Sequence, residues 1–365
     1  MKLISEKGGI RERGFSLVEI LVGVLIGMIG IIVIFQMLAT AEERKRSTAS
    51  GTDAQITGAV ALQTIERDIR LSGYGFSTSA YIGCTVNAYD AGRPGGSFDF
   101  TLAPVQITQG VSGAPDTITT LWGNSPLFVA SQTFSSSTNT SKRTESRSGV
   151  QIGDLLVIAN STSCALIEIT GNTNADGVTV DHAAGSYTNL AGSSTLSRYN
   201  PGSGVPGYIS GFYYNLGNGP RRNIWVLRNH KTLTVTNDLM YSDANGDGSN
   251  DWLEISDGAI DLQADYGIDA NGDNKISSSE WTTTNPVNWS KVRAVRVALL
   301  LRSGQYERAQ VTTAAPAWAG GSFVMSNVDG TPDTNPASDN NWRNYRYRVY
   351  ETVIPLRNML WGTAP

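Results

Sequence analysis

Two segments in the second half of the chain place oxygen-bearing side chains at the spacing used by calcium-binding loops. The first, residues 243–254, reads DANGDGSNDWLE and matches the pattern D-x-[DN]-x-[DN]-G-x5-E in full. In such a loop, oxygens at positions 1, 3 and 5 converge on one ion, a glycine at position 6 makes a sharp turn, and a final glutamate closes the site. The sequence therefore predicts a Ca²⁺ site with the ligands Asp243, Asn245, Asp247, the carbonyl of Ser249, Asp251 through a water, and Glu254.

The second segment, residues 269–280, repeats the pattern with one departure. Asn274 stands where the glycine is expected, and asparagine tolerates the left-handed backbone conformation better than most residues. The alternative for both segments is that their Asn-Gly and Asp-Gly pairs only make tight turns. The flanking sequence has the character of strands rather than of paired helices, so calcium would stiffen a loop rather than operate a switch. The ligands predicted here are Asp269, Asn271, Asp273, the carbonyl of Lys275, Ser277 and Glu280.

The rest of the chain offers little for catalysis or for nucleic-acid binding. It has no G-x-S-x-G elbow, no H-E-x-x-H pair and no P-loop, and its two histidines lack zinc-ligand spacing. A hydrolase built only from carboxylates would escape these motifs. The formal net charge of −4 provides no field that would attract nucleic acid. We therefore expect neither an enzyme nor a nucleic-acid partner.

The chain contains two cysteines, Cys84 and Cys164. If this part of the protein is exported, an oxidising compartment favours one disulfide between them. Two unpaired cysteines in the core are the alternative.

A long apolar segment lies close to the N-terminus. Residues Phe15–Leu38 are long enough to span ~30 Å of hydrocarbon as a helix. The basic residues before them hold the N-terminus in the cytoplasm, so the rest of the chain lies on the far side of the membrane. Glu19 falls within this segment, and a carboxylate there is costly unless it has a partner, although it can also snorkel to the surface. Glu19 is therefore a candidate functional residue.

The junction before the apolar segment identifies the kind of export signal. A secretory signal peptide is cleaved after its apolar core, whereas here the Gly14–Phe15 junction precedes it. This order, with Glu19 as the fifth residue after the junction, resembles the prepilin peptidase site of type IV pilins and type II secretion pseudopilins. The resemblance implies cleavage after Gly14, N-methylation of Phe15, and a contact between Glu19 and the amino terminus of a neighbouring subunit during assembly.

The remaining elements can be read from residue spacing. Leu62, Ile65 and Ile69 recur at helical intervals and predict that the helix continues to about Ser72, before Gly73. Strand-like segments follow, among them a buried central strand at Val292–Leu301. Residues 131–148, rich in Ser and Thr, are predicted to form a surface loop.

Several segments resemble PilW-type minor pilins of type IV pili: Ile65–Tyr74, Gln263–Asp269, Trp289–Ser303 and Thr352–Asn358. Residues 84–237 are too divergent to compare. The resemblance implies an α+β lollipop, a long N-terminal helix packed on an antiparallel β-sheet. Its parts are a leader at residues 1–14, a transmembrane and assembly helix at 15–38, an amphipathic half at 39–73, and a β-rich periplasmic or extracellular domain at 74–365 that contains the loops 243–254 and 269–280.

The function that this resemblance implies is that of a minor pilin, inserted in the inner membrane and then assembled into a pilus that it helps to initiate or cap. Its partners would be other minor and major pilins, the inner-membrane assembly platform, prepilin peptidase and a tip adhesin. One alternative is a minor pseudopilin of type II secretion, similar to the J-type subunit. Another is a calcium-dependent adhesin at the pilus tip.

Overall fold

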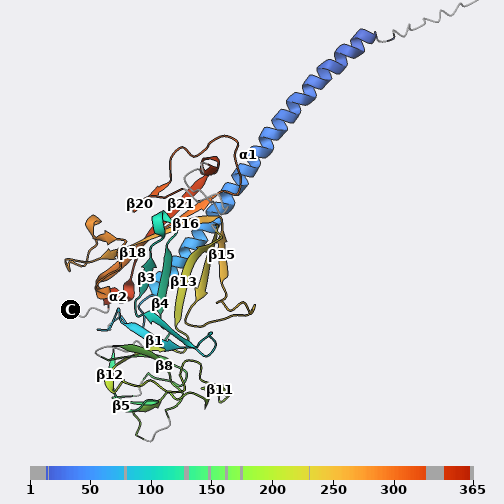
Figure 1. The fold of residues 1–365 in the computed structure, drawn as a ribbon. Helices are drawn as coiled ribbons and strands as arrows, with labels where there is room; N and C mark the ends of the chain where they lie inside the picture. The colour runs from blue at the N-terminus through green and yellow to red at the C-terminus, as the bar shows by residue number, and fades with distance from the viewer. Residues whose placement is uncertain are drawn as a thin grey trace, which may run out of the picture. The chain divides into compact units, whose positions relative to one another are not determined.

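The computed structural model describes residues 14, 16–77, 80–126, 131–146, 149–160, 163–172, 176–229, 231–325 and 341–361. Strands account for 37% of the chain and helix for 20%. The chain divides into two compact units, residues 1–52 and 53–365, and the boundary falls inside helix α1, Leu17–Leu71 (Figure 1).

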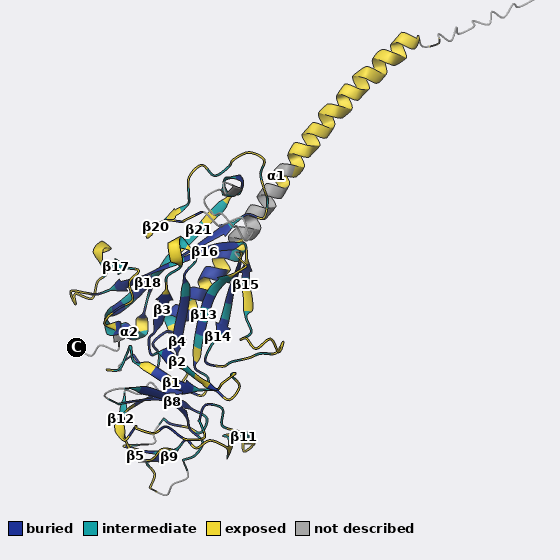
Figure 2. Cartoon of the chain, viewed as in Figure 1, coloured by how far each residue is buried: buried dark blue, intermediate teal, exposed yellow. Residues whose placement is uncertain are grey.

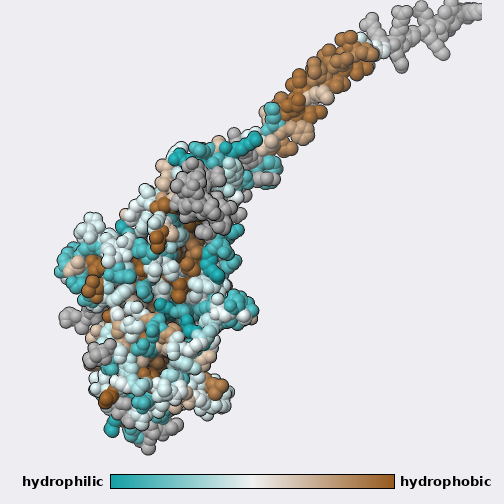
Figure 3. Space-filling model, viewed as in Figure 1, coloured by the Kyte–Doolittle hydropathy of each residue, from teal (hydrophilic) through white to brown (hydrophobic). Residues whose placement is uncertain are grey.

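Helix α1 is the only element described in the first unit. Every residue from Leu17 to Glu42 is exposed, and this segment is long and apolar enough to cross a membrane. Figure 2 shows it in yellow along its whole length, and Figure 3 shows an almost continuous apolar surface. The first half of the helix therefore has no buried face within its own unit.

The second half of α1 belongs to the β-rich unit and packs into its main core. Ala61, Leu62, Ile65 and Ile69 recur at intervals of three or four residues, so they share one face, and all four are buried. The chain then leaves the helix through Gly73, whose φ of 83° is easily adopted by glycine but rarely by other residues.

Five β-sheets form the rest of the second unit. The eight-stranded sheet has the order β2 (Ser97–Thr101), β1 (Thr85–Tyr89), β8 (Cys164–Glu168), β7 (Leu155–Ala159), β12 (Ser210–Gly217), β5 (Gln132–Thr138), β6 (Ser141–Thr144) and β9 (Thr179–Asp181). The five-stranded sheet has the order β15 (Leu253–Asp257), β14 (Thr232–Asn237), β13 (Arg221–Arg228), β4 (Thr117–Trp122) and β3 (Val105–Thr108).

The four-stranded sheet has the order β17 (Trp281–Thr282), β16 (Ala259–Ile268), β18 (Val292–Arg302) and β21 (Tyr347–Pro355). Its centre is β18, which pairs antiparallel with β16 and β21 over almost its whole length. This confirms the predicted central strand at Val292–Leu301. Two hairpins, β10 (Ser186–Thr188) with β11 (Ser194–Leu196) and β19 (Ala317–Trp318) with β20 (Gly321–Ser322), complete the sheets, and a short helix α2 (Arg357–Trp361) follows β21.

Two further cores lie on either side of the eight-stranded sheet. In β7, Leu155, Val157 and Ala159 face one core, and Leu156 and Ile158 face the other. Successive side chains of a strand point to opposite faces, so a strand covered on both sides is apolar throughout. Cys84 and Cys164 form a disulfide that closes a sequence separation of 80 residues, next to the parallel pair β1–β8.

The predicted α+β fold, with a long helix on one antiparallel sheet, is wrong in the proportion of strand to helix and in the number of sheets. The chain is mostly β, with one long N-terminal helix and a large domain of five sheets. The reason lies in residues 84–237, which have enough buried strands to build a sheet with two cores of their own. The loop predicted at residues 131–148 is also wrong, because β5 and β6 lie there. Phe134, Lys142 and Thr144 point inward from these strands.

Candidate functional site

The first candidate site is the beginning of helix α1. Gly14 is exposed, and Phe15, like residues 1–13 of the predicted leader, lies outside the described residues. Glu19 lies in the first turn, where the partial positive charge of the helix N-terminus favours an acid. Its backbone N–H donates to the Ser16 carbonyl at 2.9 Å, while its exposed carboxylate contacts no cation among the described residues. The Glu19 carboxylate is therefore accessible to a partner from outside the described residues.

The first acidic loop lies between β14 and β15. The Asp243 carboxylate accepts the backbone N–H groups of Asp247 at 3.0 Å and of Gly248 at 2.9 Å, which folds the first half of the loop back on itself. Asn245 accepts the N–H of Asp247 at 3.0 Å, and Asp247 accepts that of Ser249 at 2.8 Å. The side chains predicted at positions 1, 3 and 5 therefore gather around one turn of backbone.

The closing residue of this loop differs from the prediction. The Asp251 carboxylate accepts the Ala244 N–H and the Ser242 hydroxyl, both at 2.8 Å, and so joins the two ends of the loop. Glu254 instead lies in β15, where it is exposed and its backbone pairs with Thr234. Position 9, rather than position 12, closes the first loop.

The second acidic loop lies between β16 and β17 and is closed by its last residue. Asp269 accepts the N–H groups of Gly272 at 2.7 Å and Asn274 at 3.1 Å, and Asn274 has the left-handed φ of 62°. Glu280 accepts the N–H of Ala270 at 3.1 Å and that of Ser277 at 2.8 Å. In this loop the first and last predicted ligands lie at the same end.

Cationic side chains lie beside both loops, since Arg228 lies over the Trp252 ring of the first, but only in the second does one lie near a loop carboxylate. Arg293 Nε lies 3.8 Å from Asp269, and Lys291 donates to the Ala270 carbonyl at 2.8 Å. In the first loop none of the four carboxylates has a Lys or Arg partner among the described residues. The two loops share a sequence pattern but differ in how their negative charge is balanced.

Neither loop has converging metal ligands in the structure. No group of three Asp, Glu, His or Cys side chains within the described residues is placed to hold a metal ion. Most of the loop carboxylates accept backbone N–H groups instead, and these contacts lower the pKa of Asp251 and of Glu280. The other predicted ligands also lie within their loops. The Lys275 N–H donates to Asp273 at 2.8 Å, and Asn271 accepts the N–H of Asp273 at 2.9 Å.

A buried polar cluster was not predicted from the sequence. Glu168, at the end of β8, is 6% exposed and accepts hydrogen bonds from the Tyr187 hydroxyl and from the N–H groups of Arg198 and Tyr199. Its partners lie 19 to 31 residues further along the chain, and two of them are backbone groups. No spacing of residue types could therefore have identified it.

Comparison with known proteins gives one match. Residues 224–358, from β13 through β21, match the family model described as type IV pilus-assembly protein W. No curated protein and no solved structure matches the chain significantly. The match confirms the resemblance to this family for a little over a third of the chain, and it supports a role in type IV pilus assembly.

Proposed function

We propose that this chain is a minor pilin of the PilW type, which is inserted in the inner membrane and then assembled into a type IV pilus that it helps to initiate or cap. The match of residues 224–358 carries the proposal. The segment Leu17–Glu42 supports it, because a helix that is apolar on every face needs lipid or other apolar helices around it.

Processing would prepare the helix for this role. Prepilin peptidase would cut between Gly14 and Phe15, and the new amino terminus would be methylated. The basic leader would hold that end in the cytoplasm, so the β-rich unit would enter the periplasm and later the pilus surface. Glu19 would then meet the amino terminus of a neighbouring pilin, which would supply the cation that its own described residues do not. Its partners would be major and other minor pilins, the assembly platform and a tip adhesin.

The proposal is tested on protein recovered from membranes and from sheared pili. Mass spectrometry should find a mature chain that begins with methylated Phe15, and an intact leader in peptidase-competent cells would contradict it. Glu19→Ala should leave insertion and cleavage unchanged but reduce the amount of protein in sheared pili at least about tenfold. The matched control is Glu42→Ala, because Glu42 is exposed on the same helix beyond the apolar run.

Deletion of the gene distinguishes a role in the pilus from a role in type II secretion. Loss of surface pili and of twitching, with normal secretion of exoproteins, is the expected result. Loss of secretion with normal pili would replace the proposal with a minor pseudopilin.

We also propose that the first acidic loop binds Ca²⁺ through Asp243, Asn245, Asp247 and Asp251, with the carbonyl of Ser249. These side chains lie around one backbone turn whose ends Asp251 joins. Their carboxylates repel one another unless a cation is near, and no described Lys or Arg pairs with them. Binding would draw the carboxylate oxygens away from their present N–H partners toward one centre. The second loop, with Asp269, Asn271, Asp273, Ser277 and Glu280, would bind more weakly because Arg293 already lies beside Asp269.

Calcium binding is tested by thermal unfolding of the full-length protein in detergent. The protein should unfold at a higher temperature with millimolar calcium than with a chelator, and magnesium should be a poor substitute because it demands octahedral geometry and keeps its waters. Identical unfolding with calcium and with chelator would mean that both loops are turns only.

A further inference from the structure

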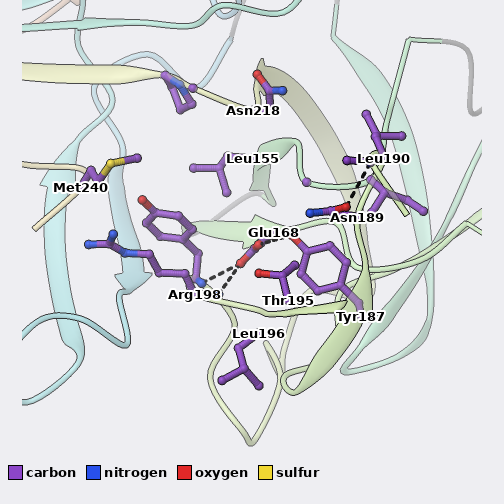
Figure 4. Close-up of a pocket in the computed structure, with 16 residues that line it drawn as sticks. Leu155, Glu168, Tyr187, Asn189, Leu190, Thr195, Leu196, Arg198, Asn218 and Met240 are labelled. Atoms are coloured by element: carbon purple, nitrogen blue, oxygen red, sulfur yellow. Dashed lines mark hydrogen bonds between the residues drawn. The ribbon is translucent and has the colours of Figure 1, made fainter. Parts of the chain in front are cut away.

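A pocket of about 480 Å³ opens beside the β10–β11 hairpin in the β-rich unit. The hairpin forms one wall through Tyr187, Leu190 and Leu196, and β7 contributes Leu155. Figure 4 shows Glu168 at its base, between the backbone of Arg198 and the ring of Tyr187. The pocket's size is within the range of sites that hold small molecules.

The charged residues of the pocket are neutralised within the protein. The Glu168 carboxylate accepts the Tyr187 hydroxyl at 2.8 Å and the N–H groups of Arg198 at 2.6 Å and Tyr199 at 2.9 Å. The Arg198 guanidinium donates to both oxygens of Asp90, at 2.6 and 2.8 Å, and to the Tyr241 carbonyl. A charged ligand entering the pocket would lose its hydration without gaining an unpaired opposite charge. The pocket is therefore suited to a neutral ligand.

The groups that remain available include amide donors, the Thr195 hydroxyl and apolar surfaces. Asn189 uses its side-chain oxygen to accept the N–H groups of Ala191 and Ser193, and Asn218 uses its oxygen to accept from Asn124. Neither side-chain NH₂ group donates to another group in the described part of the chain. In Figure 4 the amide nitrogen of Asn189 faces the side of the pocket where Leu155 lies.

The apolar side chains around the opening are unusually exposed. Leu190 is 62% exposed, Leu196 70% and Met240 47%, although all three line one pocket. The ring of Tyr187 is held in place by its hydroxyl bond to Glu168. The pocket thus combines an aromatic ring held by a hydrogen bond, aliphatic walls and two NH₂ groups that donate to no other described group.

We propose that this pocket binds a neutral sugar unit that carries hydroxyl and acetamido groups, as part of a glycan. The C–H faces and the acetamido methyl of such a sugar would pack on Tyr187 and the aliphatic walls, which is how aromatic side chains contribute most of their binding energy. Its hydroxyl and carbonyl oxygens would accept hydrogen bonds from the NH₂ groups of Asn189 and Asn218. A neutral glycan would thus contact both the apolar surfaces and the NH₂ donors, and it would bring no charge that needs a partner.

The test is a titration of the full-length protein, in a detergent without a sugar headgroup, with N,N′,N″-triacetylchitotriose. Calorimetry and saturation-transfer NMR should show binding, with transfer to the acetamido methyl groups. The double variant Asn189→Asp and Asn218→Asp should bind about tenfold more weakly or worse. Each substitution keeps the oxygen that accepts hydrogen bonds inside the protein and replaces the NH₂ donor with a carboxylate oxygen, and the control variant adds the same negative charge outside the pocket. Two lost bonds of about 1 kcal/mol each correspond to more than tenfold.

Asn288→Asp is the matched control, because it makes the same chemical change at an exposed residue that lines no part of this pocket and also accepts an N–H, that of Ser290, through its oxygen. Its affinity for chitotriose should equal that of the unchanged protein. No binding of chitotriose, equal weakening by the control, or stronger binding of a sulfated chito-oligosaccharide would overturn the proposal. Binding of an uncharged peptide in place of chitotriose would overturn it as well.

Discussion

The two halves of helix α1 share one continuous backbone, yet only the second half buries apolar side chains against the rest of the chain. Between Leu17 and Leu38 the apolar side chains cover every face and all are exposed. In the second half, a stripe that includes Ile65 and Ile69 is buried against the sheets, and the rest of the surface is mostly polar apart from a few exposed residues such as Val60. A stripe needs one surface, whereas a helix that is apolar all round needs neighbours on every side. The second half is thus stabilised by contacts within its own chain, whereas the first half is long and apolar enough to be surrounded by lipid.

The largest difference between the halves is expected in the free energy of unfolding, when one isoleucine in each half is replaced by alanine. Ile65→Ala leaves a cavity in the core and should lower the free energy of unfolding of the β-rich unit by about 2–5 kcal/mol. Ile29→Ala, at a residue that is 55% exposed, should leave it unchanged. All eight tryptophans lie beyond residue 121, so their fluorescence during urea unfolding in detergent reports on this unit alone. Equal losses in both variants would contradict the distinction.

The glycines of the helix offer a second and smaller contrast. A Cβ atom at Gly58 would lie 2.5 Å from a ring carbon of Tyr350 and 2.9 Å from Leu301, so Gly58→Ala should destabilise the β-rich unit by about 1–3 kcal/mol through overpacking. A Cβ at Gly27 would meet nothing within 4 Å, so Gly27→Ala should not change unfolding. The same urea titration checks both variants, and an unaffected Gly58→Ala would mean that Tyr350 can move aside freely.

The halves of α1 also show what the sequence could predict. The apolar run and the stripe of Leu62, Ile65 and Ile69 are local patterns, and the helix extends close to the predicted limits of residues 15 and 72. Strand β18 was recognisable because Arg293 and Arg296 alternate with valines before an all-apolar end. The arrangement of five sheets was not, because β7 and β8 are buried on both faces and carry no alternation that assigns a residue to one core or the other.

For the candidate sites, too, the sequence predicted the local pattern but not the contacts that depend on the rest of the fold. Both acidic loops follow from a short pattern, and their predicted residues other than Glu254 do lie on two compact turns. The pattern could not show that Asp251 closes the first loop, because that depends on β15 beginning at Leu253 and drawing Glu254 into the sheet. The balance of charge at the second loop depends on Arg293 and Lys291, which reach it from outside the pattern.

Two acids of the helix, one in each half, extend the comparison to pH. Asp68, in the second half, is 1% exposed and accepts hydrogen bonds from the Asn223 amide at 2.8 Å and the Trp225 indole at 3.1 Å. Burial raises its pKa above the ordinary 3.8, against the opposing effect of these bonds. A raised pKa means that the contribution of this group to stability is complete below pH 3.8 and is lost as the pH rises through the folded-state pKa.

Asp68→Asn should therefore gain stability relative to the unchanged protein between pH 4 and pH 7.5. Urea unfolding at both pH values measures the difference. Glu19→Gln, at the exposed acid of the first half, should leave the unfolding of the β-rich unit unchanged at each pH. Parallel profiles for Asp68→Asn and the unchanged protein would show that Asp68 does not carry this dependence.

The smallest expected effect is the stabilisation of the acidic loops by Ca²⁺, a partner that, like that of the first half of α1, would come from outside the chain. Extracellular calcium modules bind with a Kd of about 10⁻⁴ to 10⁻³ M, so about 2 mM calcium should stabilise the unchanged protein by about 0.7–1.8 kcal/mol. Asp251→Asn should remove most of this gain, because Asp251 joins the ends of the first loop. Glu254→Gln also removes one negative charge, but from β15, and this variant should still be stabilised by calcium. Thermal unfolding with calcium and with chelator measures each variant.

The second loop completes this test, because Arg293 and Lys291 already supply positive charge beside it. Asp269→Asn should therefore reduce the calcium gain by less than Asp251→Asn does. If Glu254→Gln abolishes the gain and Asp251→Asn does not, then the twelve-residue ligand set is correct and β15 must open at Glu254 when calcium binds. If Asp269→Asn has the larger effect, the nearby cations do not weaken the second loop, and the balance of charge does not decide which loop recruits an ion.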